Sequence, residues 1–364
     1  RTSAVDLGYV TRNSEMFGGL WMHADIDGSM QSFRHLSANI SGMIDSVEIN
    51  QYLYRNVEVE GRYADSIWDG TVAVRDRNIN MDLMGRFDLE KSMPEFDFTM
   101  NLAHADLHKL NLIKEDSVFT ASALVTASFK GNGADNLEGD LRLINSILTN
   151  SRGRLSIYDF FVTSGKVNGE PLLTLRSDFA DAEIRGPYNF DAIRSTVGTM
   201  LFRLFPSRFR APQSGSGEEA VKAMFTLNAR VKRVDKLNEF LGTGVTISEG
   251  SLVTGRFMSD RSEMAAGLKS DAITYAGTRL GKMNLSGSVN GGKMVVELNA
   301  DTIVLPDKSE LGNFILEANS NTDTIDLGIR WDNQDGGKTV GEVKARGFFS
   351  LNNTNRSVLT VGIL

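Results

Sequence analysis

Apolar and polar residues alternate with a period of two in segment after segment of this chain. Residues 96–102 read Phe-Asp-Phe-Thr-Met-Asn-Leu, and residues 294–300 and 325–331 follow the same rule. Successive side chains of a β-strand point to opposite faces, so these segments predict half-buried strands with one apolar and one wet face. The turn signals between such segments are Asp69-Gly70, Gly131-Asn132-Gly133, Asn168-Gly169, Asn290-Gly291-Gly292 and Asp335-Gly336-Gly337.

An internal repeat adds to this pattern. Residues 98–111 and 225–238 both begin with Phe-Thr-x-Asn and end with Lys-Leu-Asn, at a constant offset of 127 residues (225 minus 98, and 236 minus 109). After one residue of slippage, the Leu-Val-Thr of 124–126 returns at 252–254. A glycine followed two residues later by an aromatic residue also recurs, at Gly61-Arg62-Tyr63, Gly85-Arg86-Phe87, Gly186-Pro187-Tyr188 and Gly255-Arg256-Phe257. Internal repeats favour an elongated, repeat-built architecture over one globular core around an active site.

The predicted fold is therefore all-β: an elongated, repeat-built and mostly antiparallel sheet with a few short helices. We expect β-repeat segments at 1–190 and 220–364, separated at 191–219 by an amphipathic helix and a flexible linker. The apolar face can be filled by a partner sheet or left as a trough for acyl chains, and periodicity does not separate these outcomes. The groove candidates are Val57, Val59, Met81, Leu83, Phe96, Phe98, Met100, Leu102, Phe225, Leu227, Met294, Val296, Leu298, Ile325, Leu327, Ile329 and Trp331.

The helix expected at 191–206 is the most unusual local feature. Asp191 is a plausible N-cap, Pro206 ends the helix, and the Gly- and Ser-rich stretch up to Glu219 predicts a flexible linker. Its apolar stripe comprises Ile193, Val197, Met200, Leu201, Phe202, Leu204 and Phe205. Because arginines flank this stripe, the helix can lie in a membrane interface. The favoured interpretation is that it packs on the sheet or plugs its end.

Composition excludes several classes of function. A net charge of −7 disfavours nucleic acid as a partner, and the absence of cysteine excludes disulfides and thiolate metal sites. His104 and His108 have i, i+4 spacing but no third ligand, so a solvated helix face is a better interpretation than a metal site. Asp25–Ser29 begins like a calcium loop but lacks its later glutamate, so an acidic turn is the better interpretation there. No nucleophile elbow or phosphate-binding loop is found. We expect no enzyme, no catalytic residue, no metal and no cofactor.

The chain contains no run of about 20 apolar residues that would span a bilayer. It opens at Arg1 in the middle of a pattern, which suggests a piece of a longer protein. Any membrane anchor is then expected in regions outside this chain.

Three loose motifs carry a family resemblance: Asp106-Leu107-His108-Lys109-Leu110 after a strand, the strand at 52–61, and the segment 178–190 with a helix and Pro206 behind it. Together they resemble the translocation-and-assembly module B family of AsmA-like bacterial envelope proteins, most of all its Bacteroidota-type members. The resemblance covers most of the chain.

The resemblance implies that the sheet is curled (taco-like) and has an apolar groove. It also implies an interior segment of a periplasmic protein that carries phospholipid along this apolar β-groove toward the outer membrane. Its expected partners are phospholipid acyl chains and an outer-membrane barrel protein of the assembly-module type. One alternative is a scaffold that assists outer-membrane barrel proteins by adding their strands to its sheet edge. Another is an adhesin-like repeat with a closed sheet.

Overall fold

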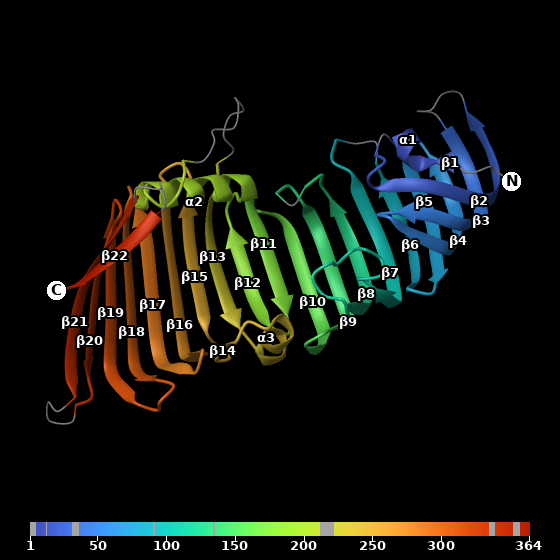
Figure 1. Cartoon of the computed structure of the whole chain (residues 1–364). Helices are drawn as coiled ribbons and strands as arrows, with labels where there is room; N and C mark the ends of the chain where they lie inside the picture. The colour runs from blue at the N-terminus through green and yellow to red at the C-terminus, as the bar shows by residue number, and fades with distance from the viewer. Residues whose placement is uncertain are drawn as a thin grey trace. The chain divides into compact units, whose positions relative to one another are not determined.

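A computed structural model describes residues 5–11, 13–30, 36–89, 92–133, 135–211, 222–334, 339–351 and 357–364. The chain is mostly β and divides into two compact units, each described by itself below (Figure 1). Unit 1 comprises Arg1–Gly165, Leu175–Asp178 and Glu239–Gly242, and unit 2 comprises Lys166–Thr174, Phe179–Asn238 and Thr243–Leu364.

The strands of unit 1 follow one another in chain order and pair antiparallel with their sequence neighbours. Short turns connect most of them, as expected for a meander of alternating segments. The elements are β1 (Val5–Asp6), α1 (Leu7–Thr11), β2 (Phe17–Met30), β3 (Leu36–Ile49), β4 (Tyr52–Ala64), β5 (Ile67–Asp76), β6 (Ile79–Asp88), β7 (Glu95–Asp106), β8 (Thr120–Lys130), β9 (Glu138–Asn150) and β10 (Gly153–Val167).

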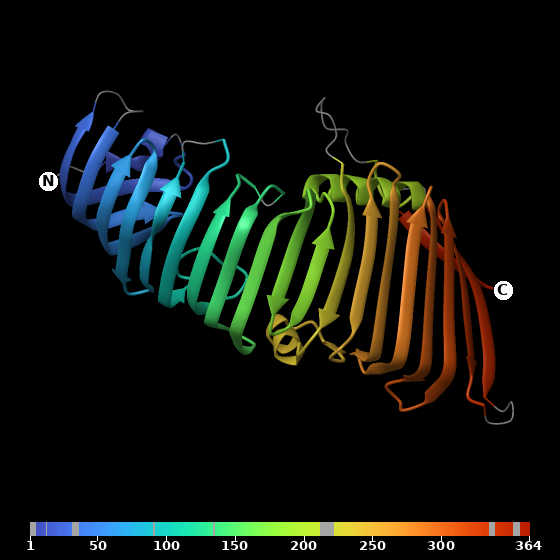
Figure 2. The same cartoon turned by 180° about the vertical axis from the view of Figure 1, so that it is seen from behind.

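The strands of unit 2 also form an antiparallel sheet, in which β13 pairs with both β12 and β15, and β16 pairs with β14, β15 and β17 (Figure 2). From β16 to β22 each strand pairs with the next. The elements are β11 (Glu170–Ser177), β12 (Ala180–Arg185), α2 (Phe190–Leu204), β13 (Met224–Val231), α3 (Asp235–Leu241), β14 (Val245–Ile247), β15 (Leu252–Met258), β16 (Glu263–Tyr275), β17 (Thr278–Asn290), β18 (Lys293–Val304), β19 (Glu310–Asn321), β20 (Thr324–Asp332), β21 (Val340–Leu351) and β22 (Ser357–Ile363). Three elements have residues in both units: Lys166–Val167 of β10 belong to unit 2, whereas Leu175–Ser177 of β11 and Glu239–Leu241 of α3 belong to unit 1.

The predicted mostly β, antiparallel class is confirmed, whereas the predicted curl is not, because the sheet is not strongly curled. Three turn signals do lie between consecutive strands: Gly131-Asn132-Gly133, Asn168-Gly169, and Asn290-Gly291-Gly292, of which Asn290 is the last residue of β17. Asp69-Gly70 is not a turn: it lies within β5, where Gly70 is paired with Gly61. The Asp335–Gly337 signal and the linker from 212 to 219 fall outside the described residues.

The internal repeat corresponds to a shared local structure. Strand β7 runs into a helical turn at Asp106–Asn111 before β8 pairs with it, and strand β13 is followed by α3 before β15 pairs with it. The register differs between the copies, because Phe98 pairs with Ala127 while its counterpart Phe225 pairs with Phe257. The repeat therefore specifies the order of strand, helical turn and strand, but not the register of the pair.

A crease bends four neighbouring strands of unit 2. Asp271, Lys282, Asp301 and Asn313, in β16 to β19, lack a register partner although both flanking positions are paired. Lys282 and Asn313 have φ of 43° and 44°, a conformation that bends a strand. Figure 1 shows the lower ends of β17 and β18 turning away from the straight part of the sheet. The bend encloses a small core of Met283, Ala300, Ile303 and Phe314.

Candidate functional site

Side chains from consecutive strands form straight rows across one face of the sheet, here called the apolar face. In unit 1 the register places seven apolar residues of β4 to β10 in one line, the central row. Its members are Val59, Val72, Leu83, Met100, Val125, Leu143 and Phe160. Apart from buried Val125, these side chains are only partly buried, whereas a packed partner sheet would bury a whole row.

A short helical segment covers one end of this face. Leu110 of the turn after β7 is 0% exposed and packs with Val57, Val74 and Ile79, while Leu107 of the same turn packs at the edge of this cluster. Asp106 holds the turn, because its carboxylate accepts a hydrogen bond from the Lys109 backbone N–H at 3.1 Å and pairs with the Lys109 ammonium at 2.8 Å. Partial burial raises the pKa of Asp106, but the bonds from Lys109 outweigh it and leave that pKa below the usual value.

The other end of the unit 1 face is aromatic. Tyr63, Trp68, Phe87, Phe96 and Phe129 occupy matched positions in β4 to β8. The Phe96 and Phe129 rings stack at 5.0 Å between centroids, and those of Phe87 and Phe96 meet edge to face at 6.0 Å. These side chains form a continuous aromatic row at one margin of the apolar face.

Three glycines lie between the aromatic row and the central row, where the register aligns Gly61, Gly70 and Gly85. A Cβ on Gly70 would lie 2.9 Å from the Trp68 ring, and a Cβ on Gly61 would lie 2.7 Å from it. The indole therefore covers the strip that the glycines leave, as the Gly-x-aromatic pattern predicts for its neighbouring gap. Because Gly61 and Gly70 lack Cβ atoms, the Trp68 ring can lie directly on the strip at these two positions.

Unit 2 repeats the arrangement with three parallel rows. The first, the helix-covered row, consists of Phe225, Phe257, Met264, Val289, Met294, Ser320 and Ile325. The second, the small-residue row, consists of Leu227, Gly255, Ala266, Gly287, Val296, Ala318, Leu327 and Ala345. The third, the leucine row, consists of Val253, Leu268, Leu285, Leu298, Leu316 and Ile329. Neighbouring rows are two residues, or about 7 Å, apart along each strand.

Helix α2 packs on the first of these rows. Met200 and Leu204 are 3% and 2% exposed and form a cluster with Phe257 and Val289. In Figure 1 the helix crosses the upper ends of the unit 2 strands. The N-cap lies two residues earlier than predicted, at Asn189 rather than Asp191. The Asn189 side chain accepts a hydrogen bond from the Ala192 N–H at 2.7 Å.

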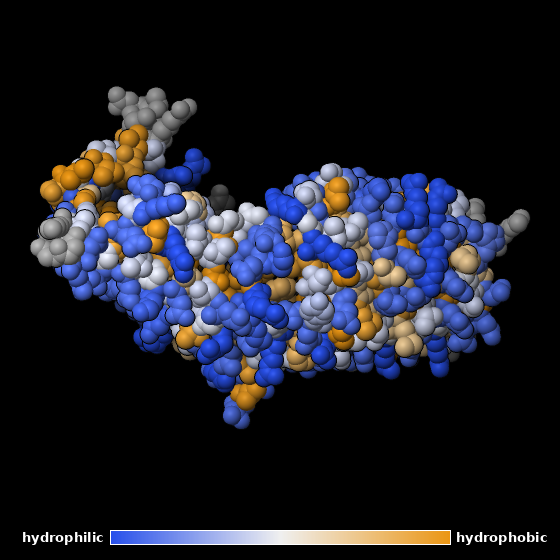
Figure 3. Space-filling model, turned by 90° about the horizontal axis from the view of Figure 1, so that it is seen from below, coloured by the Kyte–Doolittle hydropathy of each residue, from blue (hydrophilic) through white to orange (hydrophobic). Residues whose placement is uncertain are grey.

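The unit 2 apolar face therefore has two raised margins. One is α2, and the other is formed by the strand ends that bend at the crease. The small-residue row and the leucine row lie between them, and most of their apolar side chains are partly buried rather than buried. We call this strip the trough. In the space-filling view of Figure 3, hydrophobic patches are visible between hydrophilic side chains.

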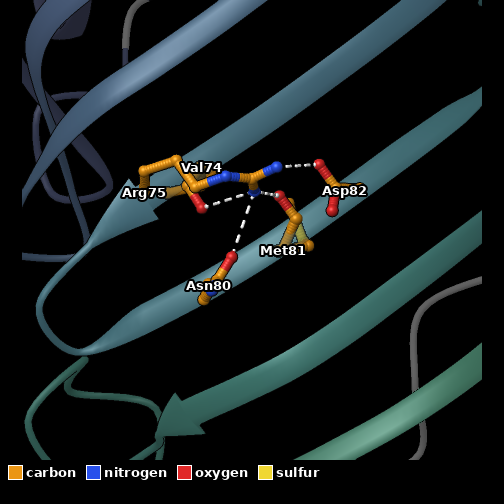
Figure 4. A network of polar contacts seen from close by, with 5 residues as sticks. All are labelled: Val74, Arg75, Asn80, Met81 and Asp82. Carbon is orange, nitrogen blue, oxygen red and sulfur yellow. Dashed lines mark hydrogen bonds and ion pairs between the residues drawn. The ribbon is translucent and has the colours of Figure 1, made fainter.

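The opposite face of the sheet is polar and held by exposed side-chain networks. Arg75 of β5 donates from one guanidinium nitrogen to the carbonyl of Met81 at 2.9 Å and to Oδ1 of Asn80 at 3.1 Å, and from the other to Asp82 of β6 (Figure 4). Arg142 pairs with Asp159 at 2.8 Å in the same cross-strand manner. Exposed pairs of this kind contribute at most about 1 kcal/mol each, so they mark a solvated surface rather than a core.

The predicted groove residues can now be placed. Those of unit 1 share the apolar face: Val57, Val59, Met81, Leu83, Phe96, Phe98, Met100 and Leu102. In unit 2, Phe225, Met294 and Ile325 lie under α2, Leu227, Val296 and Leu327 belong to the small-residue row, and Leu298 and Ile329 belong to the leucine row. Trp331 packs beside the core at the crease.

The helix candidates divide by burial. Met200, Leu204 and Phe205 are buried, and Ile193 and Val197 pack against the same cluster. Leu201 and Phe202 are partly buried. The apolar stripe of α2 is thus largely directed at the sheet.

Several residues of the site were not expected from the sequence. Val72, Val125, Leu143, Leu285 and Leu316 complete the rows, and only the strand register reveals them. In the sequence these residues take part in the same period-two alternation, but alternation does not show which residues of neighbouring strands align. The crease was invisible, because Lys282 gives no sign of a left-handed backbone.

The candidate metal ligands do not come together. His104 lies in β7 and His108 in the following turn, where its Nδ1 is 3.2 Å from the Ile113 carbonyl. Asp25 and Asp27 lie within β2 rather than in an acidic turn, so that interpretation was wrong. Across the described ranges no group of three or more His, Asp or Glu side chains is placed to hold a metal ion. No helix in the described part of the chain is long and apolar enough to cross a membrane.

Comparison with known proteins adds no relative: no family model, no curated protein and no solved structure matches this chain.

Proposed function

We propose that this chain is part of a bridge-like conduit that carries phospholipid along an apolar β-groove in the periplasm toward the outer membrane. Membrane anchoring would come from regions outside this chain, and an outer-membrane barrel protein would receive the lipid. The family resemblance of the sequence motifs suggests this role, and the arrangement of the apolar rows supports it.

The observation that carries the proposal is the row-like continuity of an incompletely covered apolar face. The central row of unit 1 crosses seven strands, and the leucine row of unit 2 crosses six. Both run perpendicular to the strands. A ligand that follows them meets apolar side chains at every strand, which suits a long flexible hydrocarbon better than a compact ligand.

The transport mechanism would be passive. Acyl chains would lie on the rows while headgroups remain in water above the sheet, so that no charged group is desolvated. The small-residue row in unit 2 gives the chains depth. Met100, a flexible side chain of the central row, lets this surface adapt to chains of different shape. Direction would have to come from other components of the envelope.

Lipid extraction tests the proposal directly. The chain would be exported to the periplasm of a Gram-negative host, purified without detergent, and extracted for mass spectrometry. Co-purifying phospholipid at a fixed ratio to protein supports the conduit. The matched pair Leu285→Asp and Ser286→Asp places a charge on the apolar and on the polar face, respectively, of the same strand. Only the first should lower the lipid content; equal content in both variants would contradict the proposal.

A further inference from the structure

Helix α2 occupies part of the surface that the proposed function assigns to lipid. Its buried side chains Met200 and Leu204 rest on the helix-covered row, which lies next to the small-residue row and has the same apolar character. Helix and hydrocarbon cannot lie on that row together. The state with α2 on the sheet therefore has a narrower trough than a state with α2 removed.

An unsatisfied hydroxyl lies within the footprint of the helix. Ser320 is 4% exposed, and its Oγ has no hydrogen-bond partner. Its register neighbours on both sides, Met294 and Ile325, pack against the α2 cluster. A buried hydroxyl without a partner is destabilising, and water can reach it only when the cover is removed. The contact between α2 and the sheet therefore contains a polar defect that opening relieves.

The two ends of α2 are held differently. Just before the helix, two backbone hydrogen bonds hold the chain. The Gly186 N–H donates to the Pro171 carbonyl at 2.8 Å, and the Met224 N–H donates to the Pro187 carbonyl at 2.8 Å. At the exit, Ser207 donates from its backbone N–H at 3.0 Å and from its hydroxyl at 2.9 Å to the Asp323 carboxylate. The Asp323 N–H in turn bonds to the Leu204 carbonyl at 2.6 Å. Three bonds to Asp323 of the β19–β20 turn thus fasten the exit, two to its carboxylate and one from its backbone N–H.

We propose that α2 is a displaceable lid on the unit 2 trough, hinged at the Gly186–Pro187 entry and latched at Ser207 and Asp323. The inference rests on the proposed lipid-carrying function. In the closed state the lid covers the helix-covered row; in the open state this row joins the trough and accepts additional hydrocarbon.

A reversible lock tests the lid. The natural chain has no cysteine, so Ser207→Cys with Asp323→Cys introduces the only two thiols, at positions whose side chains are in direct contact. Binding of the fluorescent fatty acid cis-parinaric acid is titrated with the double variant oxidised and again after reduction. The single variant Asp323→Cys, which loses the latch but forms no internal disulfide, is the control.

We expect the oxidised protein to bind fewer probe molecules per chain than the reduced protein, and the single variant to bind at least as many as the reduced one. Equal binding by the oxidised and reduced forms, while both bind the probe, overturns the lid and leaves the conduit standing. Absence of binding by the natural chain as well contradicts the proposed function itself.

A second variant probes the defect without a disulfide. Ser320→Ala removes the unpaired hydroxyl, tightens the closed state and should weaken probe binding to the unit 2 trough about tenfold. Unchanged or stronger binding, in a protein whose thermal unfolding shows that it is folded, overturns the role of Ser320 as the weak point of the lid.

Discussion

Truncation of Leu204 to alanine tests how α2 is attached to the sheet. Leu204 is 2% exposed and lies in the cluster of Met200, Phe257 and Val289. Loss of a fully buried leucine removes its transfer free energy and leaves a cavity, which together cost about 2–5 kcal/mol. For a unit of roughly 190 residues, a loss of about 3 kcal/mol lowers the Tm by about 6–12 °C.

The assay is thermal unfolding monitored by differential scanning calorimetry, and the quantity compared is the Tm of the unit 2 transition. The matched control is Phe190→Ala on the same helix, which removes a larger apolar side chain that is 53% exposed. We expect a change of less than about 1 kcal/mol for the control, because little surface returns to water. If Phe190→Ala lowers the Tm as much as Leu204→Ala, or if neither does, α2 is not held by its buried stripe and the packing argument is wrong.

Three further predictions follow from local contacts. The pKa of Asp106 in the folded chain is lowered from its usual value of 3.8, so its carboxylate should stabilise unit 1 fully above pH 3.8 and progressively less as the pH falls through the folded pKa. In chemical denaturation, Asp106→Asn should therefore lower the free energy of unfolding less at pH 3 than at pH 7. Gly85→Ala should lose about 1–3 kcal/mol in denaturant unfolding, because its Cβ would lie 2.4 Å from a neighbouring side chain, whereas Gly133→Ala, with open space around it, should be neutral. A double-mutant cycle on the stacked rings of Phe96 and Phe129 should give a coupling of about 0.5–1.5 kcal/mol, and additive losses would show that the aromatic row is not cooperative.

The sequence predicts the class of fold because its strongest signal is local. Alternation at 96–102 places Phe96, Phe98 and Met100 on one face whatever the partner strand, and the structure confirms this placement. Turn chemistry is weaker evidence. Asp69-Gly70 has the composition of a hairpin turn, but Gly70 lies within a strand, where it pairs with Gly61 and lies beneath the Trp68 ring.

The rows could not be predicted, because register depends on contacts between strands. Gly287 and Val296 are nine residues apart and reveal nothing of their pairing, yet their alignment with Ala318 forms the small-residue row. The crease has the same origin. Lys282 and Asn313 adopt left-handed backbones because neighbouring strands bend together, which no single segment encodes.

For α2 the sequence favoured packing on the sheet, although an amphipathic stripe with flanking arginines also suits a membrane interface. Burial of Met200 and Leu204 distinguishes the two in the closed state. The latch at Asp323 was also invisible, because it joins residues that are more than a hundred positions apart.

The central claim, that hydrocarbon follows the apolar rows, is tested most directly by site-specific photo-crosslinking in the periplasm. A photoreactive phenylalanine analogue would replace Met100 or Leu298 on the apolar face, and Asn101 or Glu297 on the polar face of the same strands. We predict phospholipid adducts at Met100 and Leu298 and none at their sequence neighbours. Adducts at all four positions, or at none, would contradict the account.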